Sequence, residues 1–168
     1  MINIKTIKEK FFFNRNSPFK YIYFLINNLI SRFSFKKSFS QGSMDLILEH
    51  IFKTKNNGFY VDVGCQHPIK NNNTYLLYKK GWSGVNIDLD SVNIDLFNFF
   101  RPKDDNVKSA VSDKIETVKL FYYHQKSPIN TLDKKVSLKQ NAKIEKEINI
   151  LTNTLTDILN DFSINKID

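Results

Sequence analysis

An α/β fold around a parallel sheet is expected for this chain of 168 residues. Residues 59–65 form a short, mostly apolar run, which is typical of a strand buried on both faces of a parallel sheet. Two further runs of strand character, 84–88 and 106–111, each follow a segment with helical character. Because parallel strands need crossover connections, this alternation favours right-handed βαβ units.

Local breakers set the bounds of the elements before residue 112. Apolar side chains at helical spacing predict a helix over 45–52. Gly81 ends the helix that follows the first strand, and Pro102 stops the next one. The expected order is helix 45–52, strand 59–65, helix 74–80, strand 84–88, helix 91–100 and strand 106–111.

The C-terminal part of the chain gives weaker patterns. Residues 116–124 predict an antiparallel strand, and the polar, lysine-rich stretch 125–146 is interpreted as a loop or insertion. A weak strand is expected at 148–151. Thr154, with Asp157 three residues later, resembles a capping box and predicts the start of a final helix.

Composition indicates a single globular domain and excludes several classes of protein. Hydrophobic residues make up 41% and charged residues 25%, which are values of folded rather than disordered chains. The single cysteine, Cys65, excludes an intrachain disulfide framework and a cysteine-based zinc site. The three histidines are widely spaced, so no metal cluster is expected.

The positive charge is concentrated in an N-terminal leader. Residues 1–40 carry eight Lys or Arg and one acid, a net of +7, whereas residues 41–168 carry seventeen and sixteen, a net of +1. We therefore expect a basic, aromatic leader over 1–40 and one domain over 41–168. Lysine outnumbers arginine, the residue that nucleic-acid grooves favour, so nucleic-acid binding is not expected.

The leader contains a predicted helix. Ser17 and Pro18 suit a helix start, and residues 19–33 are mostly apolar. Fifteen helical residues reach about 22 Å, less than the roughly 30 Å of a hydrocarbon core, so the helix should not span a membrane. It either lies in a membrane interface, with its lysines toward anionic lipid, or packs on the domain that follows. The expected location is the cytoplasm, with peripheral contact at the inner membrane face through residues 1–40.

Polar residues end each of the three predicted parallel strands. The first ends in Asp62 and Gly64, the second in Asp88, and the third in Ser112 and Asp113. Ligands of open α/β sheets bind outside the carboxyl ends of the strands. Gly64 lets a ligand approach the backbone closely, and a carboxylate at Asp88 can accept hydrogen bonds from both hydroxyls of a ribose. The third strand end is placed to meet a base edge.

The ligand that fits these positions is a ribose compound without a pyrophosphate. A dinucleotide site requires the pattern G-x-G-x-x-G, but the loop after Gly64 contains no second or third glycine. A lysine of the P-loop type is also missing from the sequence. S-adenosyl-L-methionine is a ribose ligand of the expected kind.

The most specific sequence blocks are Val61-Asp62-Val63-Gly64, His67-Pro68, Asn73-Thr74-Tyr75-Leu76-Leu77-Tyr78, Lys80-Gly81-Trp82, Gly84-Val85-Asn86-Ile87-Asp88 and Ala110-Val111-Ser112-Asp113. These blocks resemble the FkbM-type S-adenosylmethionine-dependent methyltransferases, and the resemblance covers roughly residues 40–168. Residues 40–48 resemble the helix before the first strand of that family, and residues 154–159 resemble the segment before its fourth main strand.

The resemblance implies a Rossmann-like class I methyltransferase sheet and O-methylation of a hydroxyl on a sugar, a glycolipid or a similar small acceptor. It also implies roles for the strand-end residues. Asp62 and Gly64 would line the methionine and ribose side of S-adenosyl-L-methionine, and Asp88 would hold the ribose hydroxyls. Ser112 or Asp113 would meet the adenine. No catalytic residue is assigned.

Three residues at the end of the first strand have competing interpretations. Cys65 occupies a cofactor-binding position where the family often has alanine, and its alternative role is that of a small buried apolar residue. His67 has the chemistry of a general base, but its neighbour Pro68 favours a role in shaping the loop. Asp62 either contacts the cofactor or hydrogen-bonds backbone amides nearby.

The chain departs from the family pattern at residues 164–168, where the fourth strand of that family would open. The Asp-x-Glu-Gly element expected a few residues later is absent, which predicts an incomplete sheet, its N-terminal half, without the acceptor-binding half. Strand 59–64 is then expected to be an open edge. The alternative function is that of a truncated, non-catalytic relative that serves as a membrane- or partner-binding module.

Overall fold

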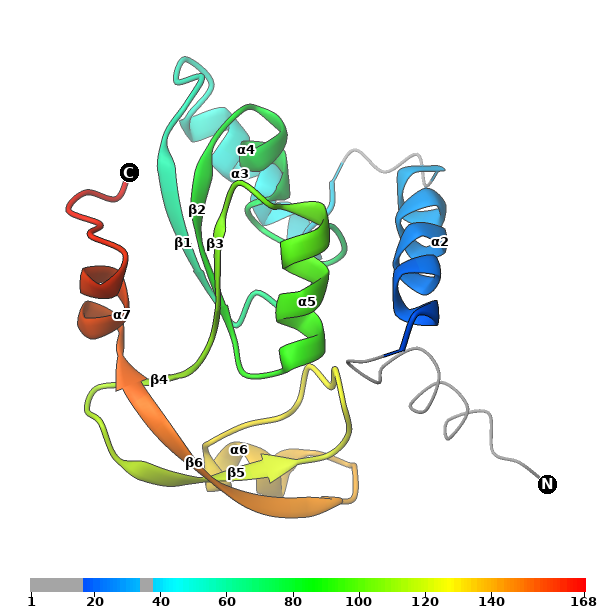
Figure 1. Cartoon of the computed structure of the whole chain (residues 1–168), viewed down its shortest axis with the longest axis vertical. Coiled ribbons are helices and arrows are strands. Elements are labelled where there is room, and N and C mark those ends of the chain that lie inside the picture. Colours follow the sequence, from blue (N-terminus) through cyan, green and yellow to red (C-terminus); the bar gives the residue numbers. More distant parts are fainter. Residues whose placement is uncertain (1–16, 34–37) are drawn as a thin grey trace.

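The computed structural model describes residues 17–33 and 38–168 and has an α/β architecture with parallel and antiparallel strands (Figure 1). The parts of the predicted leader at 1–16 and 34–37 lie outside the described residues. The elements are α2 (Phe19–Phe33), η1 (Gln41–Ser43), α3 (Met44–Ile51), β1 (Phe59–Val63), α4 (Tyr75–Lys79), β2 (Ser83–Asp88), α5 (Ser91–Phe100), β3 (Asp105–Lys108), β4 (Ala110–Ser112), β5 (Thr117–Tyr122), α6 (Lys134–Lys139), β6 (Lys146–Thr154) and α7 (Leu155–Asp161).

The first sheet consists of three parallel strands in the order β1-β2-β3. β1 pairs with β2 from Phe59 opposite Ser83 to Val63 opposite Ile87. α4 and α5 form the two crossovers, and their bounds agree with the expected ones to within one residue. The prediction of a parallel α/β arrangement is confirmed for this part of the chain, and the arrangement is compatible with part of a Rossmann-like sheet.

Helices cover both faces of the first sheet (Figure 1). Because side chains alternate along a strand, Val85 and Ile87 face one side, where Ile158 of α7 packs against them. Tyr60 faces the other side and packs with Leu77 of α4 and with Trp82. α3, α4 and α5 lie on this second side, so the carboxyl ends of the strands open at one end of a three-layer unit.

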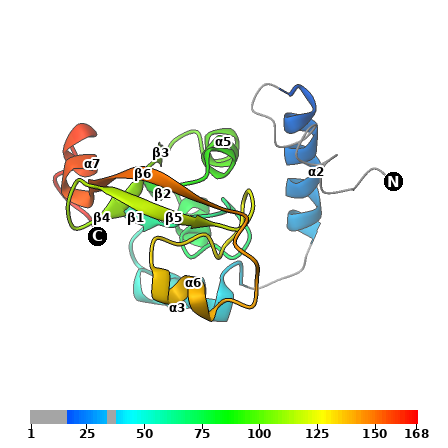
Figure 2. The ribbon, with the colours of Figure 1, turned by 90° about the horizontal axis from the view of Figure 1, so that it is seen from below.

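A second sheet, in the order β4-β6-β5, lies across the carboxyl ends of the first (Figure 2). β4 pairs with β6 in parallel, and β5 pairs with β6 in antiparallel, which confirms the antiparallel strand predicted over 116–124. The single strand expected over 106–111 is wrong, because the chain divides at Ser109 into β3, which stays with β2, and β4, which leaves it. β6 is longer than the weak strand expected at 148–151.

The interpretation of residues 125–146 as a loop is wrong at α6. Asp133 starts this helix, since its Oδ1 accepts a hydrogen bond from the backbone nitrogen of Lys135 at 2.6 Å. The rest of the stretch folds back toward β5, where the backbone nitrogen of Phe121 donates to the carbonyl oxygen of Thr131 at 2.9 Å. The segment is therefore held against the second sheet.

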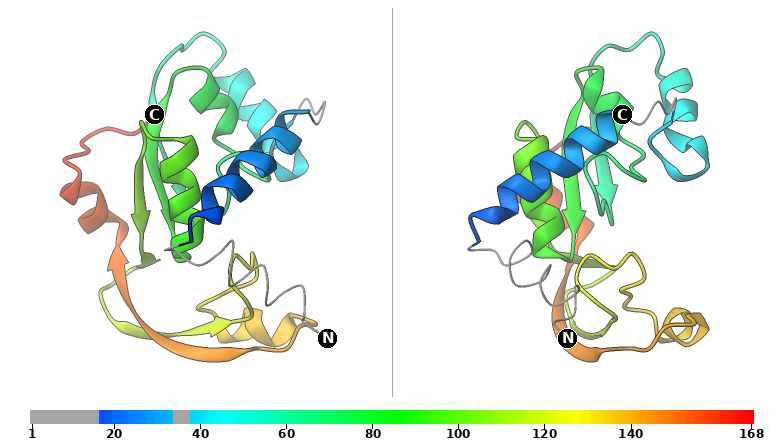
Figure 3. Two further views of the ribbon diagram at one scale, coloured as in Figure 1. Left: turned by 45° about the vertical axis from the view of Figure 1, so that its right-hand side comes forward. Right: turned by 90° about the vertical axis from the view of Figure 1, so that its right-hand side faces the viewer.

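α2 packs on α5 at one side of the molecule (Figure 3). Phe24 is completely buried against Val92 and Leu96 of α5. Lys20 is also buried, and its Nζ lies 3.2 Å from Oδ2 of Asp95. One face of the predicted leader helix therefore contacts the domain, which is one of the two arrangements expected for it.

β1 forms an edge of the first sheet among the described strands, as expected. The last residue of the chain borders that edge. The backbone nitrogen of Asp168 donates to the carbonyl oxygen of Phe59 at 3.0 Å, and the backbone nitrogen of Phe59 donates to Oδ2 of Asp168 at 3.0 Å. Two backbone groups at the start of β1 are thus satisfied by the chain itself.

Candidate functional site

A pocket of about 440 Å³ lies where the carboxyl ends of β1 and β2 meet the second sheet. Its size is within the range of pockets for small molecules and cofactors. Four groups of residues line it: the strand ends with Gly64 and Asp88, the first turn of α5 with Asp90 and Asn93, the inner side of β5 and β6, and the loop over 125–130. The pocket therefore has a polar wall from the first sheet and an apolar wall from the second.

Asp88 ends β2 and organises the polar wall. Its Oδ2 accepts from the backbone nitrogen of Gln66 at 2.9 Å, and its Oδ1 accepts from the backbone nitrogen of Asp90 at 2.8 Å and from Nδ2 of Asn93 at 3.2 Å. Burial raises the pKa of Asp88 above its ordinary value, and these hydrogen bonds oppose the rise. A carboxylate has about four acceptor positions, so one remains for a ligand.

Gly64 gives the pocket an open stretch of backbone. Its φ of 74° lies in the left-handed region that favours glycine. A Cβ built on Gly64 would have no heavy atom within 4 Å, so the backbone here faces free space. The backbone nitrogens of Gly64 and Cys65 both donate to the carbonyl oxygen of Ile87, at 2.8 and 3.2 Å, which fixes the loop against β2.

Asn93 presents an unused acceptor beside Asp88. Its side chain is buried, and Oδ1 is one of two buried side-chain polar atoms of the described residues that have no hydrogen-bond partner. A buried carbonyl oxygen without a donor costs stability, and it is able to accept a hydrogen bond from a ligand. The sequence offered one signal for Asn93, which is its place in the first turn of a helix that follows a strand-end carboxylate.

The apolar wall comes from the second sheet and was not expected from the sequence. Leu120 and Tyr122 of β5 and Ile148 and Ile150 of β6 line it. The paired positions of Leu120 and Ile148 place these side chains at neighbouring sites of one antiparallel ladder. Residues 116–124 predicted an antiparallel strand, but nothing local indicated which surface it would cover.

Asp62 and Cys65 lie outside the residues that line the pocket. Oδ2 of Asp62 accepts from Oγ1 of Thr74 at 3.0 Å and from Nδ2 of Asn72 at 3.1 Å. Burial raises the pKa of Asp62. Cys65 is buried against Ile94 and Phe97, and burial raises the pKa of its thiol, so it has the surroundings of a small apolar residue. Cys65 adjoins the pocket residues Gly64 and Gln66 in the chain, and Asp62 lies two residues before Gly64, so both expected cofactor contacts stay predictions.

Ser112 and Asp113 are carried away from the first sheet. Ser112 ends β4, where it pairs with Thr154 of β6, and its Oγ donates to Oδ1 of Asp113 at 3.1 Å. The residues that line the pocket do not include this pair. The structure therefore brings Gly64 and Asp88 together and leaves the two candidates for adenine contact at the end of a strand in the other sheet.

His67 shapes the loop between β1 and α4. Its Nδ1 accepts from the backbone nitrogens of Ile69 and Lys70, each at 3.0 Å. Burial lowers the pKa of His67 to about 3, with contributions from Lys126 and Lys70, so the ring is neutral near pH 7. These contacts give His67 the loop-shaping role that Pro68 suggested.

A buried polar network behind the first sheet holds the strand ends in place. Arg101 is fully buried at the end of α5, and its guanidinium donates to the carbonyl oxygen of Pro68, to Oδ1 of Asn72 and to Oγ1 of Thr74. Asn72 and Thr74 in turn hold Asp62. Arg101 thus connects α5 to the loop that follows β1, and both of these lead to the pocket.

Comparison with known proteins finds no matching family model, no matching curated protein and no matching solved structure. Among the described residues, no group of three or more His, Cys, Asp or Glu side chains could hold a metal ion. Within the described ranges 17–33 and 38–168, the helices are too short or too polar to cross a membrane. Inferences about function therefore depend on the pocket and its residues.

Proposed function

We propose that this chain is an S-adenosylmethionine-dependent methyltransferase of the FkbM type, which methylates a hydroxyl of a sugar, a glycolipid or a similar small acceptor. The single observation that carries the proposal is Asp88, a carboxylate at the carboxyl end of β2 that lines a pocket of about 440 Å³ beside Gly64. This is the place where a ribose is bound in open α/β sheets.

The residues of the pocket fit S-adenosyl-L-methionine. The open backbone at Gly64 allows close approach of a ligand, and the unpartnered Oδ1 of Asn93 can accept a hydrogen bond. Tyr122 and Ile150 offer an apolar surface for a base. A pyrophosphate would lack the glycine pattern that binds it, which favours a nucleoside ligand without one.

Asp88 would hold the ribose hydroxyls by accepting their hydrogen bonds. Since about one of its acceptor positions is free, a second hydroxyl would replace the bond from Asn93, which at 3.2 Å is the longest of the three. Asn93 could then turn toward the ligand. The apolar wall from β5 and β6 would keep water away from the bound nucleoside.

The bound cofactor supplies an electrophilic methyl group. The chain contributes position, because transfer to a hydroxyl is accelerated mainly by holding the two reacting atoms in line and in contact. The rigid attachment of the Gly64 loop to β2 and the capped start of α5 suit this task.

Isothermal titration calorimetry with S-adenosylhomocysteine tests the proposal on the full chain. Asp88→Asn keeps the size of the side chain but removes one acceptor oxygen and the charge, so we expect at least about a tenfold loss of affinity. Ile150→Trp fills the pocket from the opposite wall without touching Asp88, and we expect it to abolish binding. Asp161→Asn is the matched control, since Asp161 is an exposed aspartate at the end of α7.

Fluorescence of the single tryptophan, Trp82, reports whether each variant is folded. Folded variants that bind S-adenosylhomocysteine as well as the wild type would place the nucleoside elsewhere and contradict the proposal. A folded wild type that binds none would contradict it too.

A further inference from the structure

The outer face of α2 carries a stripe of exposed apolar side chains. Every member is between 49% and 53% exposed: Phe19, Ile22, Leu25, Ile26 and Leu29. Four of them follow the i, i+3, i+7 and i+10 spacing of one helix face. The opposite face is already used, since Phe24 and Lys20 are buried against α5. The helix therefore has two apolar faces, one toward the domain and the other toward the outside.

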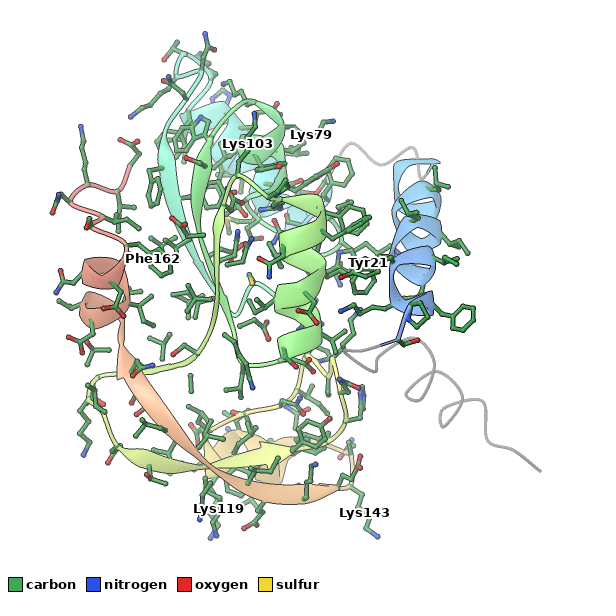
Figure 4. All side chains as sticks on the ribbon, in the orientation of Figure 1. Tyr21, Lys79, Lys103, Lys119, Lys143 and Phe162 are labelled. Carbon is green, nitrogen blue, oxygen red and sulfur yellow. The ribbon has the colours of Figure 1, made fainter. Side chains whose placement is uncertain are left out.

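Figure 4 shows how the side chains of α2 divide between these two faces. Tyr21 points toward α5, where its ring lies 5.6 Å from that of Phe99, while other side chains of α2 project away from the domain. Contiguous exposed apolar surface on a soluble domain marks a place of contact with a partner or a membrane.

The charge of the surrounding sequence distinguishes between two candidates that could cover this stripe, a second copy of the chain and a lipid surface. From residue 10 to residue 44 the sequence contains six Lys or Arg and no acid, so the stripe lies within a long cationic segment. Lys20 forms an ion pair with Asp95 on the inner face of the helix. A second copy of the chain would bring two such segments together and is opposed by like charge, whereas a surface of anionic lipid attracts them.

We propose that the α2 stripe docks this protein on a bilayer that contains anionic lipid. α2 lies in the plane of the interface, with the stripe inserted among the acyl chains and the domain held on its inner face by Phe24. The Lys and Arg residues that flank the stripe in the sequence add positive charge, which anionic headgroups attract. The docking surface is separate from the pocket, so it does not depend on the proposed methyltransferase function.

Sedimentation with sucrose-loaded vesicles tests this proposal on the full chain. We expect binding to vesicles of equal parts phosphatidylcholine and phosphatidylglycerol, weaker binding to phosphatidylcholine alone, and weakening at high salt. The triple variant Ile22→Gln, Ile26→Gln and Leu29→Gln should lower the partition coefficient by at least about tenfold, because it removes three inserted apolar side chains.

The matched control is the triple variant Ile115→Gln, Leu138→Gln and Leu151→Gln, which removes three exposed apolar side chains far from α2 in the sequence. It should bind vesicles like the wild type. Equal loss in both triple variants, or no loss in the α2 variant, would overturn the proposal. Failure of the wild type to bind anionic vesicles, with a dimer in sedimentation equilibrium that the α2 variant dissociates, would assign the stripe to a second copy instead.

Discussion

Replacement of Arg101 by methionine should destabilise the protein strongly. Arg101 has no exposed surface, and its guanidinium donates to four residues: Tyr60, Pro68, Asn72 and Thr74. Nη1 also lies 3.9 Å from Oδ2 of Asp104. Methionine fills much of the same volume, but it donates no hydrogen bond and carries no charge.

The expected loss follows from what the substitution leaves behind. Burial raises the pKa of Asp62 and that of Asp104, and the positive charge of Arg101 opposes both rises. Its removal therefore leaves one partly buried and one buried carboxylate without their cation. Removal of one partner of a buried ion pair costs about 3–5 kcal/mol in the free energy of unfolding. With a typical dependence on urea of about 2 kcal/mol per molar, the unfolding midpoint should fall by about 2 M.

Urea unfolding followed by the fluorescence of Trp82 measures this loss, because that residue is the single tryptophan and is 2% exposed. Lys103→Met is the matched control, since Lys103 is exposed two residues away and should change the free energy of unfolding by less than about 0.5 kcal/mol. A loss below about 1 kcal/mol in Arg101→Met, with an unchanged dependence on urea, would refute the assignment of Arg101 as the residue that holds the strand ends together.

Two further variants test the fold around the site. Gly84→Ala should cost about 1–3 kcal/mol and lower the melting temperature, because a Cβ would collide with the carbonyl oxygen of Tyr60 across the β1–β2 ladder; an unchanged melting temperature would contradict this packing. His67 has a folded-state pKa of about 3 against about 6.5 when unfolded, so the unfolded chain binds the proton first and wild-type stability should fall as the pH drops below 6.5. At pH 5 that loss amounts to about 2 kcal/mol in the free energy of unfolding, and His67→Asn, which keeps an acceptor for the backbone of Ile69, should remove it. The same difference in the free energy of unfolding between the wild type and His67→Asn at pH 7 and at pH 5 would argue against it.

The sequence predicted best those elements whose limits are set by local breakers. Gly81 and Pro102 sit at or near helix ends, and the helix and strand bounds around them were close to the observed ones. Ser109 was the opposite case. Its backbone nitrogen still bonds the carbonyl oxygen of Asp88 at 3.1 Å, but the next residues pair with β6, more than forty positions away. Such a distant pairing leaves no periodic signal in residues 106–111.

The candidate site shows the same division between local and distant information. Gly64 and Asp88 line the pocket because each ends a strand of one parallel ladder, which the sequence could predict. Ser112 left that ladder with β4, and the apolar wall came from β5 and β6, whose position depends on that same departure. Asp133, by contrast, was a readable helix start in a stretch that we interpreted as a loop.

Hydrogen–deuterium exchange of the full chain with and without S-adenosylhomocysteine tests the central claim most directly, because it locates the nucleoside. The account predicts that the ligand slows exchange in peptides over 63–67 and 88–93, where Gly64, Asp88 and Asn93 line the pocket, and over 120–130 at the opposite wall. Peptides over 134–139 of α6 should exchange as before. No protection anywhere, or protection confined to residues 110–114 around Ser112, would contradict the account.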